Sequence, residues 1–205
     1  MEKSKVILDA DFFRHITEVE PNSKVLEIAL DELKMTPVMH KYVADIELKQ
    51  NPHLDHLIRS GVIEIIGESD FITEENIKEY ERYFRAAYKI VNRIELGKGV
   101  DVQKYGYSFE APKESLGEIR SIYLAMRKGY KIFLSDDNGS KLVAKYVNNS
   151  KHMIKVWKLY NLFEECWKIG TSLTWKGIRN IVAKGIKNEA DRDKIRNLFC
   201  EIDAL

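Results

Sequence analysis

Acidic side chains follow two apolar segments that are typical of buried strands. Asp9 and Asp11 come directly after the first of these segments, and Asp136 and Asp137 come directly after the second. Glu118 lies in the first turn of a predicted helix that leads into the second strand. Active sites of open parallel sheets gather beyond the carboxyl ends of the strands. We therefore expect carboxylates from three separate segments to meet at one edge of a sheet.

Carboxylates that lie this close together repel one another unless a proton or a cation separates them. Hard divalent ions meet this need, because Mg²⁺ prefers carboxylate and water oxygens. The predicted cofactor is therefore Mg²⁺ or Mn²⁺, and an ion held in this way can assist in-line hydrolysis of a phosphodiester. Each acid taken alone is explained equally well as a helix cap or as a favourable charge at a helix N-terminus. Only their joint placement favours a metal site.

The composition is that of a soluble globular protein. The chain has 205 residues, of which 44% are hydrophobic and 32% are charged, and this length suits one α/β domain with a helical appendage. Its longest apolar runs are too short to cross a bilayer, and Met1 to Lys5 lacks the apolar stretch of a signal peptide. Cys166 and Cys200 form no metal-binding spacing and no disulfide framework. A cytoplasmic protein is the expectation.

The positive charge is concentrated near the C-terminus. Between Lys141 and Arg196 there are about thirteen Lys and Arg against about five acids, or about +8, although the whole chain carries only +1. Basic residues can neutralise phosphates and aromatic rings can stack on unpaired bases. Solvated helix faces explain the same pattern. For Trp157 and Tyr160, which are three residues apart, packing in the core is the favoured interpretation.

The elements that position the acids alternate between strands and helices. Predicted strands cover residues 5–8, 35–36, 62–66 and 130–134, and predicted helices begin near residues 23, 37, 53, 70, 117 and 140. From residue 152 onward only helices and loops are expected. This order favours a three-layer α/β/α fold with a central, mainly parallel sheet. We predict one domain over residues 1–150 and a basic helical C-terminal extension over residues 151–205.

Three segments in this order resemble the PIN-domain family of nucleases. They are Val6-Ile7-Leu8-Asp9-Ala10-Asp11, Leu116-Gly117-Glu118-Ile119-Arg120-Ser121-Ile122-Tyr123-Leu124-Ala125 and Ile132-Phe133-Leu134-Ser135-Asp136-Asp137. The resemblance covers residues 1–150. It implies that Asp9 is the first metal ligand, Glu118 the mid-chain acid and Asp137 or Asp136 the last, with Asp9, Glu118 and Asp137 as the catalytic set. The family commonly has Asn or Ser where this chain has Asp11.

The resemblance also implies an acid on the second helix, for which Asp45 and Glu47 are both available. If Met39, Tyr42, Val43 and Ile46 form the buried face of that helix, Glu47 lies about 80° from its centre and Asp45 about 110°. Glu47 is therefore the favoured fourth ligand.

Ser135 matches the family's small hydroxyl residue, which helps to hold the ligands. Ser135, Lys141 and Lys145 are the residues predicted to engage the substrate.

The function implied by the resemblance is metal-dependent endoribonucleolytic cleavage of RNA, with a single strand as the expected substrate. Many relatives are toxins paired with protein antitoxins, and others process RNA. An antitoxin and a second copy of the chain are the protein partners left open, and no membrane association is expected. One alternative is a haloacid-dehalogenase-like phosphatase with Asp9 as nucleophile, although that family has Thr or Val where this chain has Phe13. The other is a PIN-fold RNA-binding or docking scaffold with an idle site.

Overall fold

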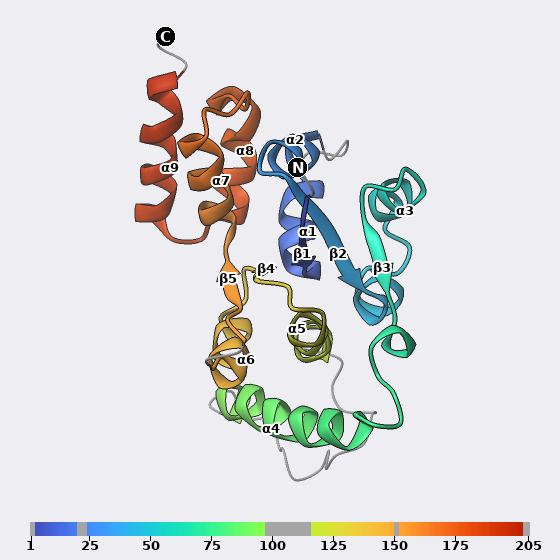
Figure 1. The fold of residues 1–205 in the computed structure, drawn as a ribbon. Helices are drawn as coiled ribbons and strands as arrows, with labels where there is room; N and C mark the ends of the chain where they lie inside the picture. Colours follow the sequence, from blue (N-terminus) through green and yellow to red (C-terminus); the bar gives the residue numbers. More distant parts are fainter. Residues whose placement is uncertain (1–2, 20–23, 97–115, 150–151, 203–205) are drawn as a thin grey trace.

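The computed structural model describes residues 3–19, 24–96, 116–149 and 152–202, and it contains a five-stranded parallel sheet with helices on both faces (Figure 1). The strands are β1 (Ser4–Leu8), β2 (Met35–His40), β3 (Glu64–Ile66), β4 (Ile132–Leu134) and β5 (Lys155–Trp157). Their order across the sheet is β3-β2-β1-β4-β5. The predicted three-layer α/β/α fold with a central parallel sheet is therefore confirmed.

The central strand β1 is buried on both faces. Val6 and Leu8 belong to one hydrophobic cluster and Ile7 to the other, and each is at most 1% exposed. Alternate side chains of a strand point to opposite faces, and a parallel strand covered on both faces is apolar throughout. Ile7 and Leu8 are in register with Phe133 and Leu134 of β4. This register brings the residues that follow β1 and β4 side by side at one edge of the sheet.

The helices divide between the two faces of the sheet. The cluster that contains Ile7 includes side chains of α4 (Ile77–Leu96), α5 (Leu116–Lys128) and α6 (Asn138–Val147). The cluster that contains Val6 and Leu8 includes side chains of α1 (Ala10–Thr17), α2 (Lys24–Glu32), α3 (Pro52–Arg59), α7 (Leu159–Lys168), α8 (Trp175–Gly185) and α9 (Glu189–Ile202). In Figure 1, α4 lies beneath α5, and α7, α8 and α9 stand side by side at the C-terminal end.

Several predicted elements differ from the structure. The prediction missed helix α1, although Phe12, Phe13 and Ile16 are all completely buried. The helix predicted to begin at Pro37 was wrong, because Pro37 lies within β2, just before the point at which β3 starts to pair. A strand can accept a residue without an N–H at such an unpaired position. The predicted buried face of that helix was also wrong, since Ile46 is 44% exposed.

Other predicted boundaries shift by a few residues. The helix predicted over residues 70–96 begins at Ile77, after a short 3₁₀ turn at Glu68–Asp70. The glycines predicted to end it and the loose segment predicted after them lie outside the described residues. Gly61 and Gly129 follow α3 and α5 with φ of 72° and 73°, as expected for glycines that end helices.

The C-terminal segment contributes a strand and shares the main core. The prediction of only helices and loops after residue 152 was wrong, because β5 pairs with β4 along its length. Phe163 of α7 and Phe199 of α9 are completely buried in the same cluster as Val6 and Leu8. Trp157 and Tyr160 pack against this cluster, in agreement with the packing interpretation. The sheet and the core thus continue past residue 150, where a domain boundary was predicted.

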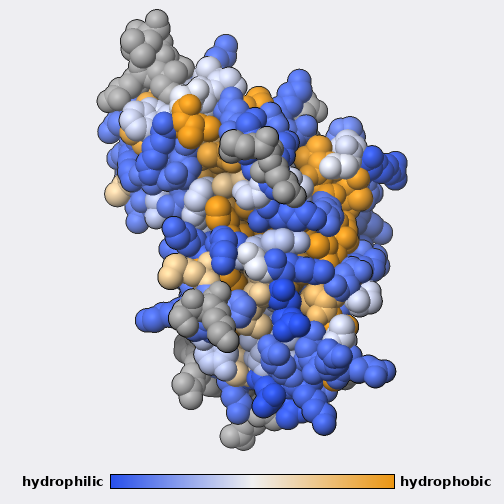
Figure 2. Space-filling model, in the orientation of Figure 1, coloured by the Kyte–Doolittle hydropathy of each residue, from blue (hydrophilic) through white to orange (hydrophobic). Residues whose placement is uncertain are grey.

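Hydrophilic side chains dominate the face shown in Figure 2, and hydrophobic side chains gather there in separate patches. Among the described residues, no helix combines the length and the apolar character that a membrane span requires.

The shared core predicts that the C-terminal helices unfold together with the sheet. Phe163→Ala should lower the free energy of unfolding by about 3–5 kcal/mol, the usual cost of removing a buried phenyl ring, and should leave a single cooperative transition. Chemical denaturation followed by both fluorescence and circular dichroism measures this. Ile169→Ala, at a position that is 52% exposed, is the control and should change stability by less than about 0.5 kcal/mol. Two separate transitions, with only one of them shifted, would instead indicate an independent C-terminal domain.

Candidate functional site

Asp9 follows β1 directly and is held from the neighbouring strand. Its side chain is 3% exposed. Its backbone N–H donates to the carbonyl of Leu134 over 3.0 Å, and its Oδ2 accepts a hydrogen bond of 2.8 Å from the Ser135 hydroxyl. Ser135 Oγ also lies 2.8 Å from Ser140 Oγ and 3.3 Å from the backbone nitrogen of Asp137. The end of β4 therefore fixes the orientation of the Asp9 carboxylate.

Ser135 is completely buried, and its place beneath Asp9 corrects the prediction that it engages the substrate. A side chain without exposed surface has no contact to offer a ligand, so Ser135 is a positioning residue. This agrees with the role in holding the ligands that the resemblance implies. Lys141 and Lys145, the other residues predicted to engage the substrate, are exposed on α6.

Glu118 enters the same edge of the sheet from the first turn of α5. It is 7% exposed, and its Oε2 has no hydrogen-bond partner within the described part of the chain. A methyl group added to Gly139 would lie 3.1 Å from Glu118 Oε2 and 3.2 Å from Asp137 Oδ1. The Glu118 and Asp137 carboxylates therefore both border this glycine of α6. An unpartnered buried carboxylate oxygen is costly, which points to a missing cation or proton.

Glu47 reaches the site from a π-helical turn at Val43–Glu47. Its Oε1 accepts a hydrogen bond of 3.1 Å from the backbone N–H of Gly117. A methyl group on Gly117 would come within 2.8 Å of the Glu47 Oε2, so only glycine leaves room for this carboxylate. Asp45, the other candidate, is exposed and forms an ion pair of 2.7 Å with Lys41. Of the two acids, the structure brings Glu47 to the site.

The structure also separates Asp136 from Asp137. Asp137 caps α6 by accepting a hydrogen bond of 2.6 Å from the N–H of Gly139, on the side of Glu118. Asp136 turns the other way, because its Oδ1 accepts from the N–H of Leu159 over 3.0 Å and its Oδ2 lies 2.8 Å from His15 Nδ1. Asp136, predicted as a metal ligand, is thus engaged by α1 and α7, and Asp137 joins Asp9, Glu47 and Glu118.

Burial is the largest influence on the carboxyl groups of Asp9, Glu47 and Glu118. Burial, followed by the charge of Glu47, raises the pKa of Asp9 to about 7. Burial also raises the pKa of Glu47 to about 7. Burial and the neighbouring charges of Asp9 and Asp137 raise the pKa of Glu118 far above its usual value. In the absence of a cation, the cluster is therefore expected to keep protons that isolated carboxyl groups lose near pH 4.

The donor set fits a hard divalent cation. Asp9, Glu47, Glu118 and Asp137 offer only oxygen ligands, which suit Mg²⁺ or Mn²⁺, and the unpartnered Oε2 of Glu118 lacks the positive partner that a buried acid needs. As the side chains stand, no group of three or more Asp, Glu, His or Cys among the described residues is arranged so that it could hold a metal ion. The fit therefore rests on the chemistry of the four acids and on the buried Oε2 of Glu118, which has no hydrogen-bond partner among the described residues.

Helix α1 adds two residues that the sequence analysis missed. Arg14 donates to Asp11 over 2.9 Å and to the backbone carbonyl of Glu47 over 2.5 Å, so it ties α1 to the turn that carries Glu47. His15 pairs with Asp136, and the hydrogen bond that the imidazole donates to this carboxylate raises the pKa of His15. The local signal was available, because Asp9 precedes Phe12, Phe13 and Ile16, an N-cap residue followed by helical apolar spacing.

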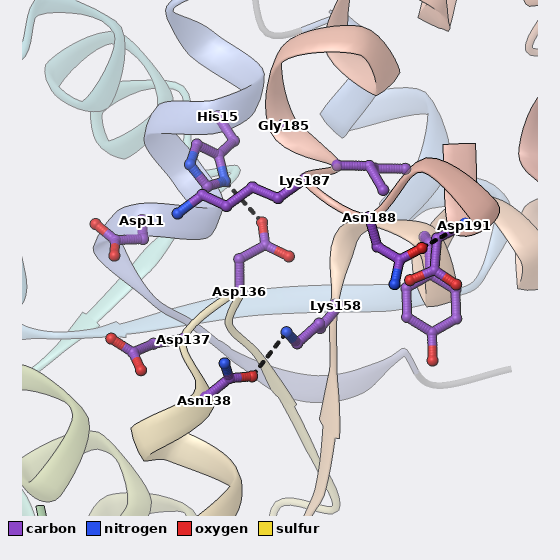
Figure 3. Close-up of a pocket in the computed structure, with 12 residues that line it drawn as sticks. Asp11, His15, Asp136, Asp137, Asn138, Lys158, Gly185, Lys187, Asn188 and Asp191 are labelled. Carbon is purple, nitrogen blue, oxygen red and sulfur yellow. Dashed lines mark hydrogen bonds and ion pairs between the residues drawn. The ribbon is translucent and has the colours of Figure 1, made fainter. Parts of the chain in front are cut away.

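A pocket of about 280 Å³ opens beside these acids. Figure 3 shows around it Asp11 and His15 from α1, Asp136 and Asp137 from the segment after β4, and Asn138 from the start of α6. Lys187 and Asn188 from the connection between α8 and α9 and Asp191 from α9 complete this side. Asp137 lines the pocket and also belongs to the acidic cluster.

Comparison of the chain with known protein families, with curated proteins and with solved structures finds no match.

The raised pKa of Asp9 predicts a pH-dependent stability. A carboxyl group with a folded pKa above its unfolded value contributes stability that is present below pH 4 and is lost as the pH rises through about 7. Without metal, Asp9→Asn should therefore become progressively more stable than the wild type between about pH 5 and pH 8. Thermal melts in EDTA measure the difference.

Mn²⁺ should raise the wild-type melting temperature more at the higher pH, because binding displaces protons, and should have little effect on Asp9→Asn. If the melting temperatures of the wild type and Asp9→Asn in EDTA differ by the same amount at every pH, the Asp9 carboxyl group does not have the raised pKa that its burial implies.

The contact between Gly117 and Glu47 predicts that Gly117→Ala destabilises the protein, although replacing a helical glycine by alanine normally stabilises a helix. Gly→Ala inside a helix normally stabilises by about 0.5–1 kcal/mol. Gly117→Ala should instead destabilise by about 1–3 kcal/mol, because the added methyl group displaces the Glu47 carboxylate. Gly177→Ala in α8 is the control, since its methyl group would meet Thr174 Oγ1 at an ordinary 3.6 Å. Equal gains in stability for both variants, measured by chemical denaturation, would show that Glu47 is not held against α5.

Proposed function

We propose that this protein is a metal-dependent endoribonuclease that hydrolyses RNA phosphodiester bonds at the acidic cluster Asp9, Glu47, Glu118 and Asp137. The observation that carries the proposal is the buried Glu118 carboxylate, whose Oε2 has no partner among the described residues and whose neighbours are also acids. Nothing in such an arrangement stabilises the native fold, because burial of like charges costs free energy. Perturbed acids that cluster at the carboxyl edge of a sheet are a common feature of functional sites.

The resemblance to the PIN-domain family supports the same reaction. The three segments that carry the resemblance contain Asp9, Glu118 and Asp137. Asp9 directly follows β1, Glu118 lies in α5 and Asp137 lies in the segment after β4. A bound Mg²⁺ or Mn²⁺ supplies Lewis-acid chemistry for hydrolysis of a phosphodiester. The resemblance leaves two biological settings open: the toxin of a toxin–antitoxin pair and an enzyme of RNA processing.

The chain's own residues prepare the site in distinct ways. Ser135 orients Asp9, and the N–H of Gly117 orients Glu47. Asp137 caps α6, so one of its oxygens is occupied by the N–H of Gly139. Arg14 fixes α1 against the turn that carries Glu47. The ligands are therefore held by hydrogen bonds from backbone and hydroxyl groups, which limits the reorganisation needed when an ion binds.

The expected result is cleavage of single-stranded RNA with Mg²⁺ or Mn²⁺ and none with EDTA. Asp9→Asn and Glu118→Gln should each reduce the rate at least about a hundredfold without unfolding the protein, because each removes a charge at the reacting centre. Ser135→Ala should reduce it by about 10- to 100-fold, as for other residues that support metal ligands. Asp45→Asn, an exposed acid on the same turn as Glu47, is the matched control and should retain the wild-type rate. Gel analysis of a labelled RNA measures these rates.

Four outcomes would overturn the proposal. Full activity of Asp9→Asn, or cleavage that persists in EDTA, would exclude the acidic cluster as a metal-dependent site. Release of phosphate from small phosphomonoesters, with RNA left intact, would favour the phosphatase alternative. Tight binding of RNA without cleavage under any metal condition would favour the idle scaffold.

A further inference from the structure

Residues after position 150, beyond the segments that resemble the PIN-domain family, form one side of the pocket beside the acidic cluster. Its walls come from α1, from the segment after β4, from the start of α7 and from the connection between α8 and α9. Its lining residues are Asp11, His15, Asp136, Asp137, Asn138, Lys158, Tyr160, Gly185, Ile186, Lys187, Asn188 and Asp191. Asp137 belongs both to this lining and to the acidic cluster. A ligand in the pocket therefore lies next to the proposed reaction centre.

The two lysines of the pocket are not neutralised by its acids. Lys158 Nζ donates to the amide oxygen of Asn138 over 2.9 Å. Lys187 extends across the pocket towards His15 (Figure 3), and among the described residues no carboxylate lies within ion-pairing distance of either ammonium group. Both lysines have positive charge available for an anion from outside the protein.

Three of the four aspartates in the lining already have partners. Asp136 pairs with His15 and with the N–H of Leu159, Asp11 pairs with Arg14, and Asp137 caps α6. The fourth, Asp191, lines the pocket from α9. Of these four aspartates, Asp11 and Asp136 pair with basic side chains of α1, whereas neither Lys158 nor Lys187 pairs with a carboxylate among the described residues.

The remaining lining residues suit a nucleobase. Tyr160 is partly exposed and presents an aromatic ring to the pocket. Asn188 accepts from the N–H of Asp191 through its Oδ1, which leaves its NH₂ group as a donor. Aromatic rings bind unpaired bases by stacking, whatever the base. A volume of about 280 Å³ is at the low end for a ligand pocket and suits one unstacked nucleotide rather than a helix.

We propose that this pocket binds one unpaired nucleotide of the RNA substrate, adjacent to the bond that is cut, with its phosphate at Lys158 and Lys187 and its base against Tyr160. This inference rests on the proposed function and names the substrate class more closely, as single-stranded RNA. It also gives the C-terminal helices a role. They build the wall of the pocket that the sheet alone does not provide.

The test measures binding separately from cleavage. A single-stranded RNA of about ten nucleotides is titrated against the full chain in EDTA, over a range of salt concentrations. Lys187→Ala should weaken binding about tenfold and should lower the slope of log K against log salt by about 0.7, the value for one phosphate contact in a single strand. Tyr160→Leu, which keeps an apolar side chain for packing, should weaken binding at least about fivefold. A duplex of the same sequence should bind more weakly than the single strand.

Lys184→Ala is the matched control, because Lys184 is exposed on α8 but does not line the pocket. It should leave both the affinity and the salt slope unchanged. Equal affinities and equal salt slopes for Lys184→Ala and Lys187→Ala would overturn the inference.

The two proposals fail in different ways. If RNA is cut with metal but the Lys187 and Tyr160 variants cut it with unchanged KM and kcat, the pocket proposal fails and the nuclease proposal stands. If RNA binds through Lys187 but is never cut, the nuclease proposal fails and the binding pocket stands.

Discussion

The burial of several carboxylates at one edge of the sheet is the constraint on which the rest of the site depends. Glu118 and Asp9 are both nearly inaccessible to solvent. The charge of Asp9 raises the cost of ionising Glu118, and the charge of Glu47 raises the cost of ionising Asp9. A fold tolerates this only where a proton or a cation compensates for it. The surrounding residues accommodate the acids rather than neutralise them. Ser135 donates to Asp9, and the glycines at 117 and 139 leave the space in which Glu47, Glu118 and Asp137 lie.

The same constraint explains why adjacent aspartates have different roles. Asp136 and Asp137 follow one strand and both line the pocket, yet their carboxylates have different hydrogen-bond partners. Asp136 holds His15 and the first turn of α7, so it joins the N-terminal part of the chain to the C-terminal helices. Asp137 stays with Glu118 and begins α6. One residue thus assembles the walls of the pocket, and the other contributes to its chemistry.

The C-terminal helices connect packing with the proposed substrate site. Phe163 and Phe199 join the core that also contains Leu8, which fixes α7, α8 and α9 against α1. A side chain at Gly185 would come within 2.7 Å of Leu159, and this close approach lets the α8–α9 connection lie beside His15. Apolar packing therefore determines where Lys187 and Asn188 stand. In this arrangement the basic C-terminal region contributes two lysines to a pocket that also contains a residue of the acidic cluster.

Local patterns in the sequence determined the parallel α/β fold and the acids that end β1 and β4, because apolar runs and the residues that follow them report directly on strand ends. They also indicated Glu118, whose helix precedes β4. They did not reveal β2 as a six-residue strand, since Pro37 is typical of a helix start. They also did not reveal β5, which begins with a lysine where β4 is apolar throughout. Only the tertiary structure decided between Asp136 and Asp137 and between Asp45 and Glu47. Those choices depend on which residue lies next to each carboxylate in space. Glu47 and Gly117, for example, are 70 residues apart in the sequence, so no local pattern indicates their contact.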